Sequence, residues 1–457
     1  MTRVGKGGML KLGKIRINEE KKKMLQVGFA RVDITPTLGS PLAGYGTHRP
    51  AKTVLDPLEL NAIAFSDGEN KAVLISCDLI YVMEEPATRI RQLIFETCGI
   101  SADHIFIHGL HQHTSVRIGS RPCHLEEGIV DDAYLSVLFR KFCDVTALAL
   151  SDLAPATATA GEKEAPEKFS FIRRYRMKNG TVRTNPGIAN PDAIGPVGEA
   201  DNTVRLVKFI REGKDDIALV HFSTHSDVIA GNGISADWPG FIRRTTEKEM
   251  EGVRCVALCG PQGDTNHVDV MGNFRTGYGH SAYMGKVIAK TALSMWDDLK
   301  ALAPDKVWGR VEMKYIPTNT LGLEKLDEYQ KMQEDIDAGK LNISRDMGLQ
   351  AQLERVLSLP EETLYQKVPV SVLCLGDLCF AGFGGEAFTQ YGRDMKKAFP
   401  ETFVLSLCLT NGGQGYLPTK EAFEEGGYEA SSSRFSPETQ EILTGSAIEM
   451  IKEYLAK

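Results

Sequence analysis

The sequence predicts an α/β fold in which mixed β-sheets are flanked by helices within a single large domain. Two observations favour this class. Three segments repeat one pattern, in which two apolar runs are joined by a tight polar turn, and helical stretches lie between them. In addition, no long linker rich in proline, glycine or serine divides the 457 residues. Strands and helices that interleave in this way are typical of sheets with helices packed on their faces.

The three repeated segments are predicted to be β-hairpins, because a short polar turn between apolar runs is the usual hairpin signal. They cover residues 60–78 around Asp67-Gly68, residues 204–225 around Glu212-Gly213, and residues 370–386 around Gly376-Asp377.

Helices and further strands are expected between and after the hairpins. Apolar residues recur at the spacing of one helix face in residues 84–98, and a second helix is predicted over residues 282–302. Residues 255–259 and 403–409 are short apolar runs, which predicts buried strands.

The domain is expected to span residues 25–457. Residues 1–24 are basic and lack the apolar core of a signal peptide, so we interpret them as a disordered tail of a cytoplasmic protein. A boundary is conceivable near Ala303-Pro304, but the third hairpin returns to the same pattern beyond it. The charged, glutamine-rich helical segment near residues 323–359 is predicted to be an insert that borders or covers a cleft.

Charge and composition exclude several classes of partner. The formal net charge of -7 does not supply the basic surface that nucleic-acid binding needs. No apolar run approaches the ~20 residues that span a bilayer, so integral membrane association is not expected. The nine cysteines include no CxxC pair and lie mostly in apolar segments. This pattern predicts reduced, buried thiols rather than a thiolate metal site.

Histidines gather where predicted strands end. Four of the ten histidines fall within residues 104–113, and His111 and His113 follow an apolar run directly. Side chains two residues apart on an extended backbone, as in this His-x-His pair, point to the same face. Alone, such a pair is most often part of a surface loop or a hydrogen-bonded pair. However, a second apolar run ends at His221 and is followed by His225. Two such exits favour one metal or substrate site.

Glu386 and Tyr416 are candidates to complete that site. Glu386 follows two glycines and is expected in the first turn of a helix, where free amides orient a carboxylate. It would supply the carboxylate that a site of two histidines lacks, although a helix cap is the alternative. Tyr416 lies in a glycine-rich loop, where a packed aromatic residue is the alternative.

Two other polar segments are weighed in the same way. The turn after residues 255–259 presents Gln262, Asp264, Asn266 and His267, and loops at strand ends gather ligand contacts in α/β proteins. A turn stabilised by its own side-chain hydrogen bonds is the alternative. The adjacent Arg173 and Arg174 offer forked donors for a carboxylate or an amide oxygen, and a basic hairpin surface is the simpler interpretation. Of this pair, Arg174 is taken as the candidate.

Taken in order, these segments resemble the neutral/alkaline non-lysosomal ceramidase family in its amino-terminal catalytic domain. The resemblance covers nearly the whole chain from about Leu25. Its motifs are Val27-Gly-Phe-Ala-Arg-Val-Asp-Ile-Thr-Pro, His111-Gln-His, Phe222-Ser-Thr-His, Gly263-Asp-Thr-Asn, Gly384-Gly-Glu-Ala-Phe-Thr and Gly415-Tyr-Leu-Pro-Thr-Lys-Glu-Ala-Phe.

The resemblance implies one zinc ion per chain, and another divalent metal would suit the same ligands. It places the ligands on His111, His225, Glu386 and Tyr416. It makes His113 a residue that binds or polarises the reacting carbonyl group, while the metal activates a water that attacks an amide. The remaining site predictions are Asn266 and Arg174 as catalytic residues, and Gln262, Asp264 and His267 as substrate contacts.

The sequence departs from the family in two places. Where family members carry a serine in a Gly-Asn-x-Ser-Pro-Asn-like turn, this chain has Gly263-Asp-Thr-Asn-His, so a serine nucleophile is not expected. The sequence also ends at Lys457, which leaves no room for the carboxy-terminal β-sandwich of longer ceramidases. The expected partner is a small N-acyl compound, smaller or more polar than ceramide, because the sequence shows neither an amphipathic helix with a basic face nor an exposed apolar stretch.

Three functions remain open from the sequence. The first is a zinc-dependent hydrolase that cleaves a carbon-nitrogen amide bond of an N-acyl substrate. The second is a metal-dependent hydrolase of an ester or a carbohydrate-derived substrate on the same fold, since folds do not fix chemistry. The third is a non-catalytic, metal-containing binding protein, whose metal would be fully coordinated by protein.

Overall fold

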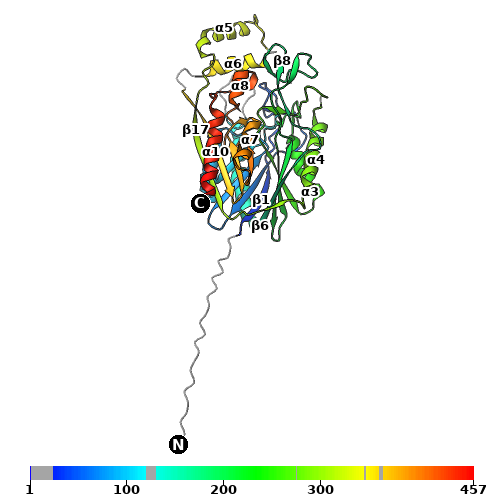
Figure 1. The fold of residues 1–457 in the computed structure, drawn as a ribbon, viewed down its shortest axis with the longest axis vertical. Helices are drawn as coiled ribbons and strands as arrows, with labels where there is room; N and C mark the ends of the chain where they lie inside the picture. The colour runs from blue at the N-terminus through cyan, green and yellow to red at the C-terminus, as the bar shows by residue number, and fades with distance from the viewer. Residues whose placement is uncertain (2–23, 120–129, 274, 344–345, 360–363, 457) are drawn as a thin grey trace.

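The computed structural model describes residues 1, 24–119, 130–273, 275–343, 346–359 and 364–456. The predicted tail of residues 1–24 therefore falls almost entirely outside the described residues, as does Cys123. The described chain forms two main β-sheets that face each other, with helices on both outer faces, and several smaller sheets of two or three short strands (Figure 1). The predicted class, mixed sheets with flanking helices, is confirmed.

The larger sheet mixes antiparallel and parallel pairs. Its strand order is β14-β12-β11-β6-β1-β3-β4-β5, and β16 pairs with β6 beside this path. The pairs β12/β14 and β4/β5 are parallel, whereas the other pairs are antiparallel. The strands are β1 Gln26–Asp33, β3 Glu59–Ser66, β4 Lys71–Cys77, β5 Ile105–Gly109, β6 Ala154–Glu164, β11 Thr203–Arg211, β12 Asp216–Phe222, β14 Val253–Cys259 and β16 Lys300–Leu302.

The smaller sheet has the order β17-β18-β19-β21, with β19 and β21 parallel. Its strands are β17 Val307–Pro317, β18 Tyr365–Leu375, β19 Leu378–Phe383 and β21 Phe403–Leu407. Apolar side chains of both sheets meet in one buried core, which includes Phe65, Phe106 and Phe209 from the larger sheet and Phe380 and Leu405 from the smaller. Burial of these large side chains holds the two sheets face to face.

Helices cover the outer face of each sheet, which makes four layers. On the larger sheet lie α1 Glu84–Cys98, α2 Asp132–Ser151, α3 Asp237–Glu249 and α4 Tyr278–Leu293. On the smaller sheet lie α7 Thr389–Ala398 and α10 Thr439–Leu455. Figure 1 shows α3 and α4 on one side of the molecule and α10 on the other. None of the described helices is long and apolar enough to cross a membrane.

Shorter elements gather mainly toward one end of the two sheets, where Figure 1 shows α5, α6, α8 and β8. They include α5 Leu326–Asp337, α6 Met347–Ser358, α8 Lys420–Glu425, α9 Tyr428–Ser432, and the short helices η1 Ala102–His104 and η2 Leu323–Lys325. The short strands of the chain are β2 Thr53–Val54, β7 Phe171–Ile172, β8 Arg174–Met177, β9 Val182–Thr184, β10 Ala193–Pro196, β13 Gly233–Ile234, β15 Thr265–Asn266, β20 Glu386–Ala387 and β22 Tyr416–Leu417.

The three predicted hairpins are confirmed as β3/β4, β11/β12 and β18/β19, each antiparallel around its predicted turn. The helix predicted over residues 84–98 is α1, and the strand predicted at residues 255–259 is part of β14. The predicted insert near residues 323–359 contains α5 and α6.

Two predicted boundaries are wrong. The helix predicted over residues 282–302 ends at Leu293, and Lys300–Leu302 instead form β16, which pairs with β6. Tertiary pairing thus overrides local helical periodicity there. The strand predicted to Leu409 ends at Leu407, because Leu409 has a left-handed backbone with φ 47. The chain near Ala303-Pro304 passes from the larger sheet to the smaller one.

Gly28 allows β1 to lie directly against the end of α2. A Cβ atom at this position would come within 2.0 Å of the Ala149 carbonyl oxygen. We expect Gly28→Ala to destabilise the protein by about 1–3 kcal/mol, because the obstructing atom is backbone. Gly445→Ala is the control, since a Cβ there meets nothing within 4 Å. It lies in α10 and should stabilise by up to about 1 kcal/mol. Denaturant midpoints of the two variants on the same side of wild type would contradict this.

Candidate metal centre

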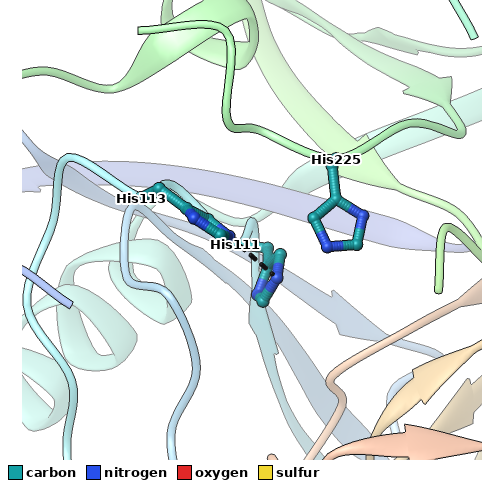
Figure 2. Close-up of side chains that lie close together, drawn as sticks. All are labelled: His111, His113 and His225. Carbon is teal, nitrogen blue, oxygen red and sulfur yellow. Dashed lines mark hydrogen bonds between the residues drawn. The ribbon is translucent and has the colours of Figure 1, made fainter. Parts of the chain in front are cut away.

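Three buried histidines meet where two strands of the larger sheet end. His111 and His113 follow β5, and His225 follows β12. One ring nitrogen from each lies within 4.8 Å of the others. Figure 2 shows the three imidazole rings gathered around one space. The two strand exits therefore bring these three histidines together, as the sequence predicts. Imidazole nitrogens at this separation can hold a divalent metal ion.

The sequence pattern suggested an extended backbone at His111, and this is wrong. His111 has a left-handed φ of 67, so the two rings converge through a sharp bend in the loop. Its backbone N–H donates to the Leu79 carbonyl at 3.0 Å, and its Nδ1 lies 3.0 Å from the Ile80 carbonyl. A carbonyl only accepts, so Nδ1 carries a proton, and in the neutral ring Nε2 is the atom with the free lone pair.

His225 is oriented in the same manner. Its Nδ1 donates to the Gln262 carbonyl at 2.9 Å, which again leaves Nε2 with its lone pair. The Nε2 atoms of His225 and His111 each lie 3.4 Å from Oε2 of Glu386. Gln262, predicted as a substrate contact, thus acts on this site through its backbone carbonyl.

Glu386 reaches the histidines from a short strand rather than from a helix. The predicted place in the first helical turn is wrong, because α7 begins only at Thr389 and Glu386 lies in β20. Its carboxylate is buried, and its Oε2 has no regular hydrogen bond among the described residues. Burial alone would raise the pKa of this carboxyl group, but attraction to the imidazoles of His111 and His225, when these rings are protonated, holds it well below its usual value. Glu386 is therefore an ionised, buried carboxylate.

Tyr416 lies next to Glu386 because the strands that carry them pair in register. The Arg173 guanidinium lies 5.2 Å from the centre of the Tyr416 ring, and the Tyr428 ring packs edge-on at 5.4 Å. Burial raises the pKa of Tyr416 well above its usual value. The phenol therefore keeps its proton in this state of the protein.

His113 packs against both His111 and His225, with ring centres 5.0 Å and 5.8 Å away. Its Nε2 is 3.4 Å from Nε2 of His111, and the Tyr45 ring packs edge-on against it at 4.7 Å. Arg49 donates to the His113 carbonyl at 2.8 Å, which fixes the backbone there. Burial lowers the pKa of His113 well below its usual value, so its imidazole is neutral at neutral pH.

Arg173, rather than the predicted Arg174, contacts the cluster. Arg173 donates to His225 Nε2 at 3.1 Å, to Glu429 Oε1 at 2.7 Å and to the Gly263 carbonyl at 2.9 Å. Arg174 instead pairs with Glu425 at 2.9 Å. The alternative of a basic surface is wrong, because both arginines are buried. Arg173 and Glu429 are site residues that the sequence reasoning did not select.

Three other predicted residues make hydrogen bonds outside the cluster. Asp264 accepts from the backbone and hydroxyl of Thr389 and so caps α7, while Asn266 donates to Asn185. His267 pairs with Asp227 at 3.0 Å. Burial lowers the pKa of both His113 and His225, and the Asp227 carboxylate opposes this by raising it, so Asp227 lies near the cluster. Its position two residues after His225 is a sequence signal that could have indicated this.

The fold and the cluster together define a four-layer α/β protein with a buried site of three histidines and a glutamate. No family model matches the sequence, and no curated protein matches it either. Several solved structures share the fold, and they include that of a neutral ceramidase. Neutral ceramidase from Pseudomonas aeruginosa matches with a TM-score of 0.72 and 15% identity, covering 94% of this chain and 75% of that one.

The second structure, a ceramidase complexed with C2, matches with a TM-score of 0.69 and 14% identity, covering 94% of this chain and 76% of that one. The resemblance predicted from the sequence is thereby confirmed at the level of the fold. Identities this low concern the fold alone, because one fold supports many chemistries.

Proposed function

We propose that this protein is a metal-dependent hydrolase that cleaves the carbon-nitrogen amide bond of a small N-acyl substrate. The observation that carries the proposal is the position of the Glu386 carboxylate, 3.4 Å from Nε2 of both His111 and His225. Two imidazoles and one carboxylate form a common ligand set of catalytic zinc sites. The fold shared with two ceramidases supports the same reaction class.

The ligands we propose are His111, His225 and Glu386, with Tyr416 as the fourth. The donor set fits one zinc ion, and another divalent metal would also suit it. Tyr416 is protonated in this state, so its coordination would require loss of the phenol proton. When bound, the metal would lower the pKa of a water and polarise the substrate carbonyl.

The protein's own residues have separate tasks in this proposal. Ile80 and Gln262 fix the tautomers of the two histidine ligands through their carbonyls. His113 is neutral and adjacent to His111, so it can donate a hydrogen bond to an oxygen on which negative charge develops. Arg173 adds a fixed cation beside His225, held in place by Glu429.

Metal removal tests the proposal directly. Purified protein is expected to contain about one metal ion per chain and to hydrolyse members of an N-acyl substrate panel, because His111, His225 and Glu386 would leave a coordination position for water as long as Tyr416 keeps its proton. A chelator should abolish hydrolysis, and added Zn²⁺ should restore it. Metal content is measured by mass spectrometry on the same samples.

Other outcomes separate the alternatives. Chelator-sensitive cleavage of esters or glycosides, without amide cleavage, would favour the second hydrolase function. One bound ion with no hydrolysis of any substrate would favour a binding protein. Protein that takes up no Zn²⁺ would contradict the metal site itself.

A further inference from the structure

Gln112 stands between His111 and His113, but its side chain points away from the cluster. It is fully buried. Its amide nitrogen donates to Asp78 Oδ1 at 2.8 Å and lies 3.3 Å from the Ala236 carbonyl. A buried amide that donates twice fixes the backbone that carries it, because releasing it would leave buried polar groups unpaired.

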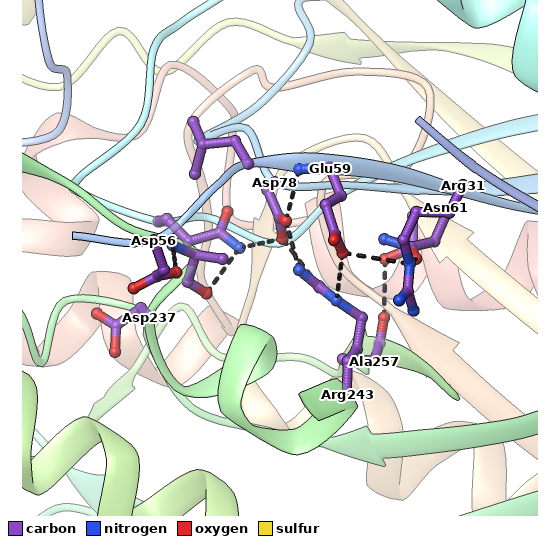
Figure 3. Close-up of polar contacts among 12 residues, drawn as sticks. Arg31, Asp56, Glu59, Asn61, Asp78, Asp237, Arg243 and Ala257 are labelled. Atoms are coloured by element: carbon purple, nitrogen blue, oxygen red, sulfur yellow. Dashed lines mark hydrogen bonds and ion pairs between the residues drawn. The ribbon is translucent and has the colours of Figure 1, made fainter. Parts of the chain in front are cut away.

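Asp78 is itself held in place from several directions. Both of its oxygens accept from the guanidinium of Arg243 on α3, and Oδ2 also accepts from the Glu59 backbone at 2.8 Å (Figure 3). Burial raises the pKa of Asp78 to about 6 in spite of Arg243, so the group is mostly ionised at neutral pH. It is therefore a fixed acceptor for Gln112.

The ion pair continues away from the histidines. Arg243 Nε lies 3.1 Å from Glu59, and Arg31 Nε lies 3.3 Å from the same carboxylate. Arg31 also pairs with Glu247 at 2.7 Å (Figure 3 labels Arg31, Glu59 and Arg243). The network thus has one end at the histidine loop and another at Arg31, among residues that do not contact the cluster.

The histidine loop needs such support. A left-handed backbone is unfavourable for histidine, which has a Cβ atom. His111 nevertheless has φ 67, and both of its own anchors are the carbonyls of Leu79 and Ile80, which follow Asp78 directly. Asp78 therefore fixes the neighbouring Leu79 and Ile80, whose carbonyls hold His111. Through its hydrogen bond with Gln112 it also fixes the residue that follows His111.

We propose that Gln112 is a positioning residue of the metal centre, which ties the bent segment of His111 and His113 to the Asp78–Arg243 ion pair. The proposal rests on the metal site described under the proposed function. It assigns Gln112 no contact with substrate or metal. Replacing a residue that orients a metal ligand without touching the metal typically lowers metal affinity by about 10- to 100-fold.

The test compares Gln112→Met with wild type in two measurements. Methionine has a similar length but cannot donate to Asp78. We expect affinity for Zn²⁺, measured by chelator competition, to fall by about 10- to 100-fold. In metal-free protein, amide hydrogen exchange of residues 109–116 should become faster. Gln112→Asn, which is shorter but keeps the amide, serves if the methionine variant fails to fold.

Arg31→Met is the matched control, because it breaks the same network at its far end. It should lower the unfolding midpoint while leaving Zn²⁺ affinity and exchange in residues 109–116 unchanged. Wild-type affinity and unchanged exchange in folded Gln112→Met would overturn the proposal. If wild type binds no Zn²⁺, the proposed function fails, and the exchange measurement alone decides whether Gln112 positions the loop.

Discussion

Replacing His111 and His225 together with alanine is expected to reduce bound metal from about one ion per chain to near none, because both nitrogen ligands are lost. The two residues come from different strand exits, and only their Nε2 atoms face Glu386. Metal content is measured by mass spectrometry after dialysis against a fixed concentration of Zn²⁺. Circular dichroism checks that the variant is folded.

The control for this variant removes two histidines that lie outside the cluster. His104 and His280 are half-buried, and the His104→Ala/His280→Ala protein should keep its metal. Loss of two imidazoles also leaves Glu386 buried with fewer partners, which costs stability. His111→Gln/His225→Gln keeps more of the side-chain volume and serves if the alanine protein does not fold. Stoichiometric metal in a folded double variant would contradict the assigned ligands.

Much of the fold could be predicted because its signals are local. The hairpins at residues 60–78, 204–225 and 370–386 need only apolar runs and a polar turn, and all three form. The segment of residues 300–302 could not be predicted in this way. Its strand exists only because β6 offers an edge for pairing, and that partner is remote in sequence.

The site was predictable as a set of segments but not as a geometry. His111, His113 and His225 gather as expected, yet the reason differs, because His111 is bent rather than extended. Adjacent residues on an extended chain point to opposite faces, so only one of Arg173 and Arg174 can face the cluster, and the sequence does not indicate which one. The structure resolves this choice, because Arg173 meets both His225 and Glu429.

Glu429→Gln is expected to be the most destabilising single change considered. Glu429 is fully buried and accepts from Arg173 Nε at 2.7 Å and from Thr184 at 2.7 Å, with Arg174 at 3.6 Å. The amide removes the negative charge and leaves Arg173 as a buried cation without its counter-ion. Breaking such a pair costs about 3–5 kcal/mol, so the denaturant midpoint should fall sharply.

A second substitution separates the lost ion pair from a general effect on packing. Arg173→Met in the Glu429→Gln background removes the stranded cation, so part of the lost stability should return, whereas independent sites would give additive losses. Asp192→Asn is the surface control, because its 4.0 Å contact with Lys178 joins two exposed side chains and should not change the midpoint measurably. Additive losses in the double variant would mean that Glu429 stabilises α9 by another route, and that Arg173 does not depend on it for its place beside His225.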